Sequence, residues 1–274
     1  MTTASRPWRL IDTGPLNGPA NMAVDEALLE SFDPDESAPV FRIYGWTPPA
    51  LSLGRYQNAA TVLDLEHCAA ESVAVVRRIT GGGVIYHAGE LTYALVCAPK
   101  HILPATSIKD SFRVLTSFLL RFYGGLGLNP RYALEDTATA GLHGERTAFC
   151  FAGRESYDIL IGGKKIGGNA QRRLKNVIFQ HGSIPLENCA FLGSGFLREP
   201  PVGVAERVVS LGELGINPDL ERLKGRLADA FREGLGCSLA PGGLTPEEEL
   251  RAERLELLKY GNPLWNRGGI TEKT

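Results

Sequence analysis

Residues 77 to 96 read RRITGGGVIYHAGELTYALV, and the rest of the chain is organised around this stretch. The apolar runs beside the glycines, VAVV before them and LTYALV after them, are rich in residues that favour strands. Glycines between two strands permit a positive φ and let a ligand approach several backbone N–H donors, and the arginines add fixed positive charge. The stretch therefore offers a site for an anion or a polarised carbonyl, although a tight strand-to-strand turn would explain the glycines equally well. The residues concerned are Arg77, Arg78, Gly81, Gly82 and Gly83.

The glycine run does not fit the two common nucleotide-binding loops. A dinucleotide fingerprint needs G-x-G-x-x-G at the start of a helix, and a Walker A loop needs a G-K-[ST] that does not follow these glycines. His87 and Glu90 come just after the loop. A single histidine between strands is more often a hydrogen-bonded structural residue than a ligand or base, so both interpretations of His87 stay open.

Composition excludes several classes of protein. At 274 residues the chain can bury a sizeable core, and 43% apolar with 22% charged residues is ordinary for a globular protein. The formal net charge of −2 gives no electrostatic reason to expect nucleic acid or an anionic membrane as a partner. No apolar stretch is long enough to cross a bilayer, and the N-terminus lacks the apolar core of a signal peptide. We therefore predict a cytoplasmic protein.

The five cysteines are scattered, odd in number and without a C-x-x-C pair, which argues against a disulfide framework and a structural zinc site. Each is by default a small buried hydrophobe. Cys150 could be a nucleophile if a nearby positive charge lowered the pKa of its thiol. Lys165 is a candidate for that charge, and His143 and Lys164 are rival bases, but the spacing alone does not bring any of them to Cys150.

Apolar periodicity predicts alternating strands and helices. Strands are expected at 8–14, 40–46 and 50–54, and a long amphipathic helix is expected at 107–125. The polar segment 133–147 is predicted to be a loop, and long loops in compact domains are often functional.

A second helix is predicted near the N-terminus. Asn21 would cap the segment MAVDEALLESF, whose apolar residues share one face, with Asp25, Glu26 and Glu30 largely elsewhere. From about residue 217, two further segments have the helical spacing and terminal charges of helices, so the chain is expected to end in a helical tail on a single domain covering 1–274.

A hairpin is predicted later in the chain. The run SYDILI is followed by Gly162-Gly163 and by a second arm that begins with Lys164 and Lys165. A further turn then leads to a strand in VIFQHGSI.

Four of these segments together resemble a known family. RRITGGGVIYHAGELTYALV, the cysteine in TAFCF, GGKKIGGNAQRR and FQHGSIPL occur in the order found in lipoate–protein ligases and octanoyltransferases, and NMAVDEALLE and PALSLGRYQN also fit. The resemblance runs from about residue 8 to about residue 260. It implies an α+β fold, a mixed sheet flanked by helices, like the catalytic domain of biotin–protein ligase.

The resemblance also implies roles for particular residues. The lysine of the family's G-x-K-I-x-G-x-A motif corresponds to Lys165, and with the glycine loop it would bind the acyl group. The cysteine that forms an acyl-thioester in the cysteine-dependent octanoyltransferases corresponds to Cys150, followed by Phe151. The predicted catalytic residues are thus Cys150 and Lys165. The predicted substrate-binding residues are Arg77, Arg78, Gly81, Gly82, Gly83, His87, Gly168 and Ala170.

The implied function is transfer of an octanoyl or lipoyl group from acyl carrier protein to a lysine of a lipoyl domain, such as the glycine-cleavage H protein. This reaction of lipoate biosynthesis would need no metal or other cofactor. The alternative is an ATP-dependent lipoate–protein ligase, which would use ATP and Mg and form a lipoyl-adenylate. A catalytically inactive lipoyl-binding module and a biotin-specific enzyme are further alternatives that fit the residues less well.

Overall fold

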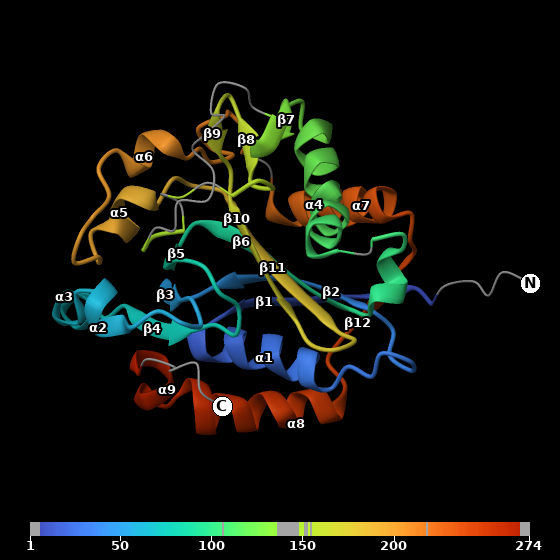
Figure 1. Cartoon of the computed structure of the whole chain (residues 1–274), viewed down its shortest axis with the longest axis horizontal. Helices are drawn as coiled ribbons and strands as arrows, with labels where there is room; N and C mark the ends of the chain where they lie inside the picture. The colour runs from blue at the N-terminus through green and yellow to red at the C-terminus, as the bar shows by residue number, and fades with distance from the viewer. Residues whose placement is uncertain are drawn as a thin grey trace, which may run out of the picture.

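In the described part of the chain, a mixed sheet of six strands forms the centre of the protein (Figure 1). The computed structural model describes residues 6–105, 107–135, 148–150, 153, 155–217 and 219–268. The strand order is β10-β11-β6-β2-β1-β12; β1 runs parallel to β2 and β12, and the other neighbours are antiparallel. The strands are β1 (Trp8–Leu16), β2 (Val40–Trp46), β6 (Glu90–Cys97), β10 (Gly168–Arg173), β11 (Ile178–Pro185) and β12 (Leu239–Gly242).

Helices α4 (Ile108–Gly125) and α7 (Leu220–Leu235) cover one face of this sheet (Figure 1). Their apolar stripes meet the sheet in an aromatic cluster, in which the Phe41 and Phe231 rings stack with centroids 4.1 Å apart and Phe118 packs edge-on against both. Burial of these three side chains stabilises the layer by roughly 2 kcal/mol each. The amphipathic helix predicted from residue 107 is confirmed.

Helix α1 (Gly18–Glu30) packs on the opposite face, between the sheet and α8 (Pro246–Leu255). It begins earlier than predicted, because the Asn17 side chain accepts a hydrogen bond from the Ala20 N–H and is the N-cap. The prediction of Asn21 as the cap is wrong. Asn21 lies inside the first turns and is fully buried.

The prediction that the acidic residues of α1 lie away from its buried face is wrong for Asp25 and Glu26, because the helix is covered on both sides, whereas Glu30 is exposed. Asp25 is 1% exposed and pairs with Arg42 of β2 at 2.6 Å. Glu26 is 5% exposed, pairs with Lys259 at 2.6 Å and accepts a hydrogen bond from the Tyr260 hydroxyl. The helix therefore has no polar face toward solvent along most of its length.

Two smaller sheets lie beside the central one and hold the segments that build the site. The first has the order β4-β3-β5, and the second, β7-β8-β9, contains the predicted hairpin with its turn at Gly162-Gly163. Their strands are β3 (Ala50–Leu53), β4 (Ala74–Arg77), β5 (Ile85–His87), β7 (Pro130–Tyr132), β8 (Ile159–Ile161) and β9 (Lys164–Lys165). The shorter helical elements are α2 (Ala59–Val62), α3 (Leu65–Ala70), η1 (Pro99–Ile102), η2 (Ala133–Glu135), α5 (Ala190–Ser194), α6 (Val204–Arg207), η4 (Glu256–Tyr260) and α9 (Pro263–Arg267).

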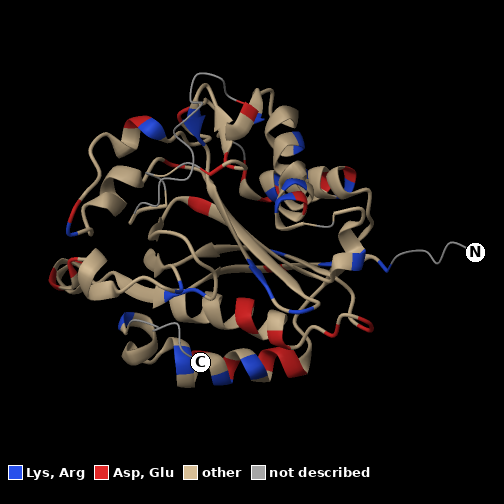
Figure 2. Ribbon diagram, in the orientation of Figure 1, with Lys and Arg blue, Asp and Glu red and all other residues tan. Residues whose placement is uncertain are grey.

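The segment after residue 217 is more than a helical tail. Helix α7 packs on the α4 side of the sheet, β12 joins the sheet edge, and α8 packs on α1. Acidic residues gather at the start of α8 and basic residues farther along it, which complements the helix dipole (Figure 2). Within the described ranges, none of the helices has the length and apolar character needed to traverse a bilayer. The predicted α+β class, a mixed sheet with flanking helices, is confirmed.

Candidate active site

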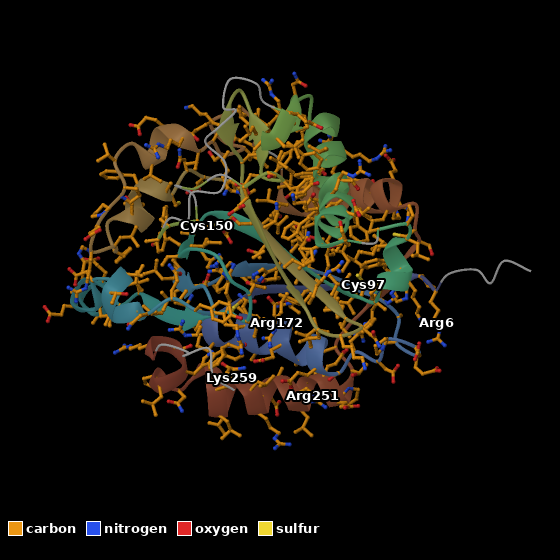
Figure 3. The ribbon with its side chains drawn as sticks, viewed as in Figure 1. Arg6, Cys97, Cys150, Arg172, Arg251 and Lys259 are labelled. Carbon is orange, nitrogen blue, oxygen red and sulfur yellow. The ribbon has the colours of Figure 1, made fainter. Side chains whose placement is uncertain are left out.

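A cavity of about 590 Å³ lies between the central sheet and the β4-β3-β5 sheet. Met22, Tyr44, Trp46 and Ile85 contribute apolar surface to it. Figure 3 shows Cys150 toward one side of the molecule, in the region of β5 and β10. The volume lies within the range of small-molecule sites, roughly 300–1,000 Å³.

The predicted residues divide into those that line this cavity and one that does not. Arg77 is not among the lining residues. Its guanidinium donates to backbone carbonyls on two sides, including Gly54 at 3.1 Å and Gly268 at 2.6 Å. Arg77 therefore links the segment that follows β3 to the C-terminal segment through hydrogen bonds. The predicted residues that do line the cavity are Arg78, Gly81, Gly82, Gly83, His87, Cys150, Lys165, Gly168 and Ala170.

Arg78 shapes the glycine loop from within the protein. Its Nη2 donates to the carbonyls of Gly81 and Gly83 at 2.7 and 2.8 Å. Its Nη1 donates to the carbonyl and hydroxyl of Ser52, and its Nε donates to the Thr80 hydroxyl. Burial lowers the pKa of Arg78 to about 10, so it stays charged near neutral pH. All five N–H groups of the Arg78 guanidinium therefore have acceptors. The two hydrogen bonds to the carbonyl oxygens of Gly81 and Gly83 hold the glycine loop in place.

The loop amides remain available to a ligand. In the described part of the chain, the N–H groups of Gly81, Gly82 and Gly83 make no hydrogen bond, whereas Val84 donates to the Ala148 carbonyl at 2.8 Å. A Cβ on Gly83 would lie 2.7 Å from the Cys150 nitrogen, so only glycine allows these two backbones to approach so closely. The glycine loop and the cysteine segment thus form one wall.

Cys150 and Lys165 meet on that wall. Lys165 Nζ donates to the Cys150 carbonyl at 3.0 Å and lies 2.7 Å from Asp158 Oδ2. A Cβ on Gly168 would lie 3.1 Å from Cys150 Sγ and 3.9 Å from Lys165 Cε, so the thiol and the lysine stem share one neighbour.

The electrostatics keep this lysine charged. Burial lowers the pKa of Lys165, but Asp158, Cys150 and Glu155 together outweigh burial, and the pKa is raised above its usual value. A charged ammonium group therefore lies against the Cys150 segment, close enough to interact with a negative charge on the sulfur. In the described residues, no group of three His, Cys, Asp or Glu side chains could hold a metal ion.

Comparison with known proteins places the chain in a family. Residues 17–232 match the family described as "Lipoyl protein ligase A/B catalytic domain". The chain belongs to the lipoyl protein ligase A/B family. It is similar to octanoyltransferase LipM of Kyrpidia tusciae, with 38% identity over 269 residues that cover 94% of this chain and 98% of that protein.

Solved structures show the same fold. Lipoate-protein ligase A bound with ATP superposes with a TM-score of 0.80 and 26% identity, over 96% of this chain and 99% of the ligase. A bi-partite lipoate protein ligase from Thermoplasma acidophilum, studied with its E2 lipoyl domain, has a TM-score of 0.79 and 24% identity, over 98% and 99% of the two chains. The lipoyl protein ligase A/B fold thus extends over nearly the whole chain.

His87 has structural partners on every side in this member of the family. Its Nδ1 lies 2.7 Å from Glu90 Oε1, its Nε2 lies 2.7 Å from Ser52 Oγ, and its ring stacks on Trp46 with centroids 3.8 Å apart. The hydrogen-bonded role considered for His87 therefore coexists with its position on the cavity wall.

Sequence reasoning missed a second histidine on the same wall. His181 Nδ1 lies 3.4 Å from Asp25 Oδ2, and its Nε2 lies 2.7 Å from the Thr80 hydroxyl. Asp25 also accepts hydrogen bonds from Arg42 and Tyr44. The sequence signal that could have pointed to this histidine's surroundings is Asp25, an acidic residue within the apolar run that forms α1.

The other residues named from the sequence add nothing to this wall. The rival base Lys164 is exposed, and His143 and Phe151 lie outside the described residues.

Proposed function

We propose that this protein, an octanoyltransferase of the lipoyl protein ligase A/B family, moves the acyl group in two steps through a thioester on Cys150. The donor is octanoyl-acyl carrier protein, and the acceptor is a lysine of a lipoyl domain such as the glycine-cleavage H protein. The observation that carries the proposal is the meeting of Cys150 and Lys165 beside the glycine loop. The similarity to octanoyltransferase LipM supports octanoyl as the acyl group. The cytoplasm stays the predicted location.

In the first step, the Cys150 thiolate attacks the thioester carbonyl of the donor. The new C–S bond forms, the bond to the carrier's sulfur breaks, and the carrier leaves as a thiolate that takes a proton from water. The Lys165 ammonium stabilises the attacking thiolate, and the amides at Gly81–Gly83 donate to the developing oxyanion. Exchange of one thioester for another is nearly balanced in free energy.

In the second step, the acceptor amine attacks the acyl-enzyme and loses a proton to solvent, while Cys150 leaves again as a thiolate. Thioester to amide is downhill, which makes the overall transfer favourable. Because its pKa is raised, Lys165 acts here as a cation that stabilises the leaving thiolate. The E2 lipoyl domain named with the archaeal ligase supports a lipoyl domain as the acceptor class.

The apolar cavity suits an eight-carbon chain. Each CH₂ buried there contributes about 0.8 kcal/mol, so the depth of the cavity selects chain length. Side chains of Met22, Tyr44 and Ile85 supply the surface for these contacts.

The test uses Cys150→Ala with octanoyl-carrier protein and a lipoyl domain. Wild type should show an octanoyl adduct by intact mass, located on Cys150 by peptide mapping, and the variant should show neither adduct nor transfer. Cys237→Ala is the matched control, because Cys237 is a partly buried cysteine outside the cavity, and it should transfer normally. Transfer by Cys150→Ala at the wild-type rate would rule out the thioester step.

The similarity to lipoate-protein ligase A bound with ATP favours one rival, an ATP-dependent ligase. That enzyme would use free octanoate or lipoate only with ATP and Mg, and Cys150→Ala would leave its rate unchanged. A direct comparison of the two donors, octanoyl-carrier protein and octanoate with ATP, separates the two reactions.

A further inference from the structure

Two arginines that have no acidic partner among the described residues flank the base of the glycine loop. The Arg55 backbone N–H donates to the Thr80 carbonyl at 2.8 Å, and Arg172 Nη1 lies 3.4 Å from the Ile79 carbonyl. Both arginines are half-buried. Burial lowers the pKa of Arg172, and the positive charge of Arg55 lowers it further, so the two guanidinium groups repel one another.

No carboxylate in the described residues forms an ion pair with either arginine. The Arg55 guanidinium lies 5.9 Å from the ring centroids of Tyr56 and Trp265. Glu26 attracts Arg172, but its oxygens are already held by Lys259 at 2.6 Å and by the Tyr260 hydroxyl. Two neighbouring half-buried cations that protein carboxylates leave unpaired are suited to an anionic ligand.

The position of the pair indicates which anion it binds. Tyr56 and Gln57 line the cavity with Gly81, and Tyr56 is 60% exposed, whereas neither arginine lines the cavity. Arg55 directly precedes Tyr56, and Arg172 lies on β10, whose first residues line the cavity, so both arginines lie just outside the lining, at the rim of the cavity. In an acyl-adenylate the phosphate is bonded to the acyl carbonyl carbon and would lie beside the reacting centre. In a carrier protein's thioester arm the phosphate is many bonds from the sulfur, and so it would reach the rim.

We propose that Arg55 and Arg172 bind the phosphodiester of the phosphopantetheine arm that presents the acyl thioester. This assignment rests on the proposed function, because it takes the donor to be a carrier-protein thioester. The two guanidinium groups would orient the arm so that its thioester enters the cavity toward Cys150.

Binding of 4′-phosphopantetheine and of pantetheine, measured by calorimetry, tests the site without turnover. Wild type should bind the phosphorylated arm about 10- to 100-fold more tightly, the gain expected of charge-assisted hydrogen bonds. Arg55→Gln and Arg172→Gln should each lose most of this preference, and Arg55→Lys should keep part of it. Arg121→Gln, an exposed arginine of α4, is the control and should keep the full preference.

Two results would overturn the assignment. One is equal binding of both arms by wild type, or a preference that survives both glutamine variants. The other is an arginine-dependent preference for AMP over adenosine with none for the phosphorylated arm, which would assign the pair to an adenylate. Wild type that shows the arm preference but transfers no octanoyl group would refute the proposed function and leave the phosphate site intact.

Discussion

Asp158 holds Lys165 in its charged form beside Cys150: Asp158 Oδ2 and Lys165 Nζ are 2.7 Å apart, and both side chains are buried. Burial alone would lower the pKa of Lys165, and the carboxylate outweighs that effect. An opposite charge at this distance shifts a pKa by about 1–3 units. Asp158, which also lines the cavity, thus sets the charge of the lysine that lies against Cys150.

Replacing Asp158 by asparagine should therefore lower the pKa of Lys165. The alkaline limb of the pH–rate profile for Cys150 acylation should move to lower pH by about one unit or more, since neutral Lys165 then accumulates earlier. Rapid-mixing measurements of acyl-enzyme formation between pH 6 and 10 would show the shift. Glu155→Gln is the comparison, because Glu155 is exposed and is the last of the groups that raise the Lys165 pKa. An unmoved alkaline limb in Asp158→Asn would contradict this role.

Two adjacent lysines allow a matched pair of substitutions. Lys165 is 3% exposed and faces Cys150, whereas Lys164 is exposed on the same short strand. Removing one charge-stabilising donor costs about 10²–10³ in rate, so Lys165→Ala should lose acyl-enzyme formation by that factor. Lys164→Ala should acylate like wild type. Equal losses in the two variants would show that the substitutions act by disrupting strand β9, and not by removing the Lys165 ammonium group.

Gly168 lies next to the Cys150 thiol. A methyl group there would lie 3.1 Å from Cys150 Sγ, with no clash against backbone. Gly168→Ala should therefore slow thioester formation at least about tenfold, since the methyl occupies space that the acyl carbonyl must cross. The variant's free energy of unfolding should change by less than about 1 kcal/mol. Gly225→Ala, with open space around its Cβ in α7, is the control. Normal acylation by Gly168→Ala would show that the substrate approaches from another side.

The local helices and strands were predictable because each has a residue pattern that can be recognised in the sequence. The amphipathic period predicted α4, and the glycine pair after the run SYDILI predicted the β8–β9 hairpin. The contact between Cys150 and Lys165 was not predictable from spacing. It depends on the bridge between Val84 and Phe149, which brings the cysteine segment to the glycine loop.

The burial of charged side chains was the second feature that could not be predicted from the sequence. The pattern of α1 placed Asp25 away from the apolar face, but Asp25 is buried against β2, where it pairs with Arg42. Similarly, Arg77 and Arg78 look equivalent in sequence, yet their side chains leave the backbone in different directions. Arg77 holds the C-terminal segment and Arg78 holds the glycine loop.

His181 should make the protein less stable in acid. Burial lowers the pKa of His181, although Asp25 raises it in part. The folded-state pKa therefore lies below the unfolded value of about 6.5. Above that value both states are neutral and His181 contributes no pH dependence. As the pH falls through about 6.5 toward the folded-state pKa, the unfolded chain binds the proton first and stability is lost.

His181→Gln removes this difference in proton uptake, so the midpoint of thermal unfolding should fall less steeply between pH 7 and 5 than in wild type. Calorimetry at several pH values measures the slope for each protein. His67→Gln is the control, because His67 is exposed on α3 and its replacement should leave the wild-type slope. If His181→Gln and wild type have the same slope, other groups, such as the half-buried His101 whose pKa is also lowered by burial, account for the acid sensitivity.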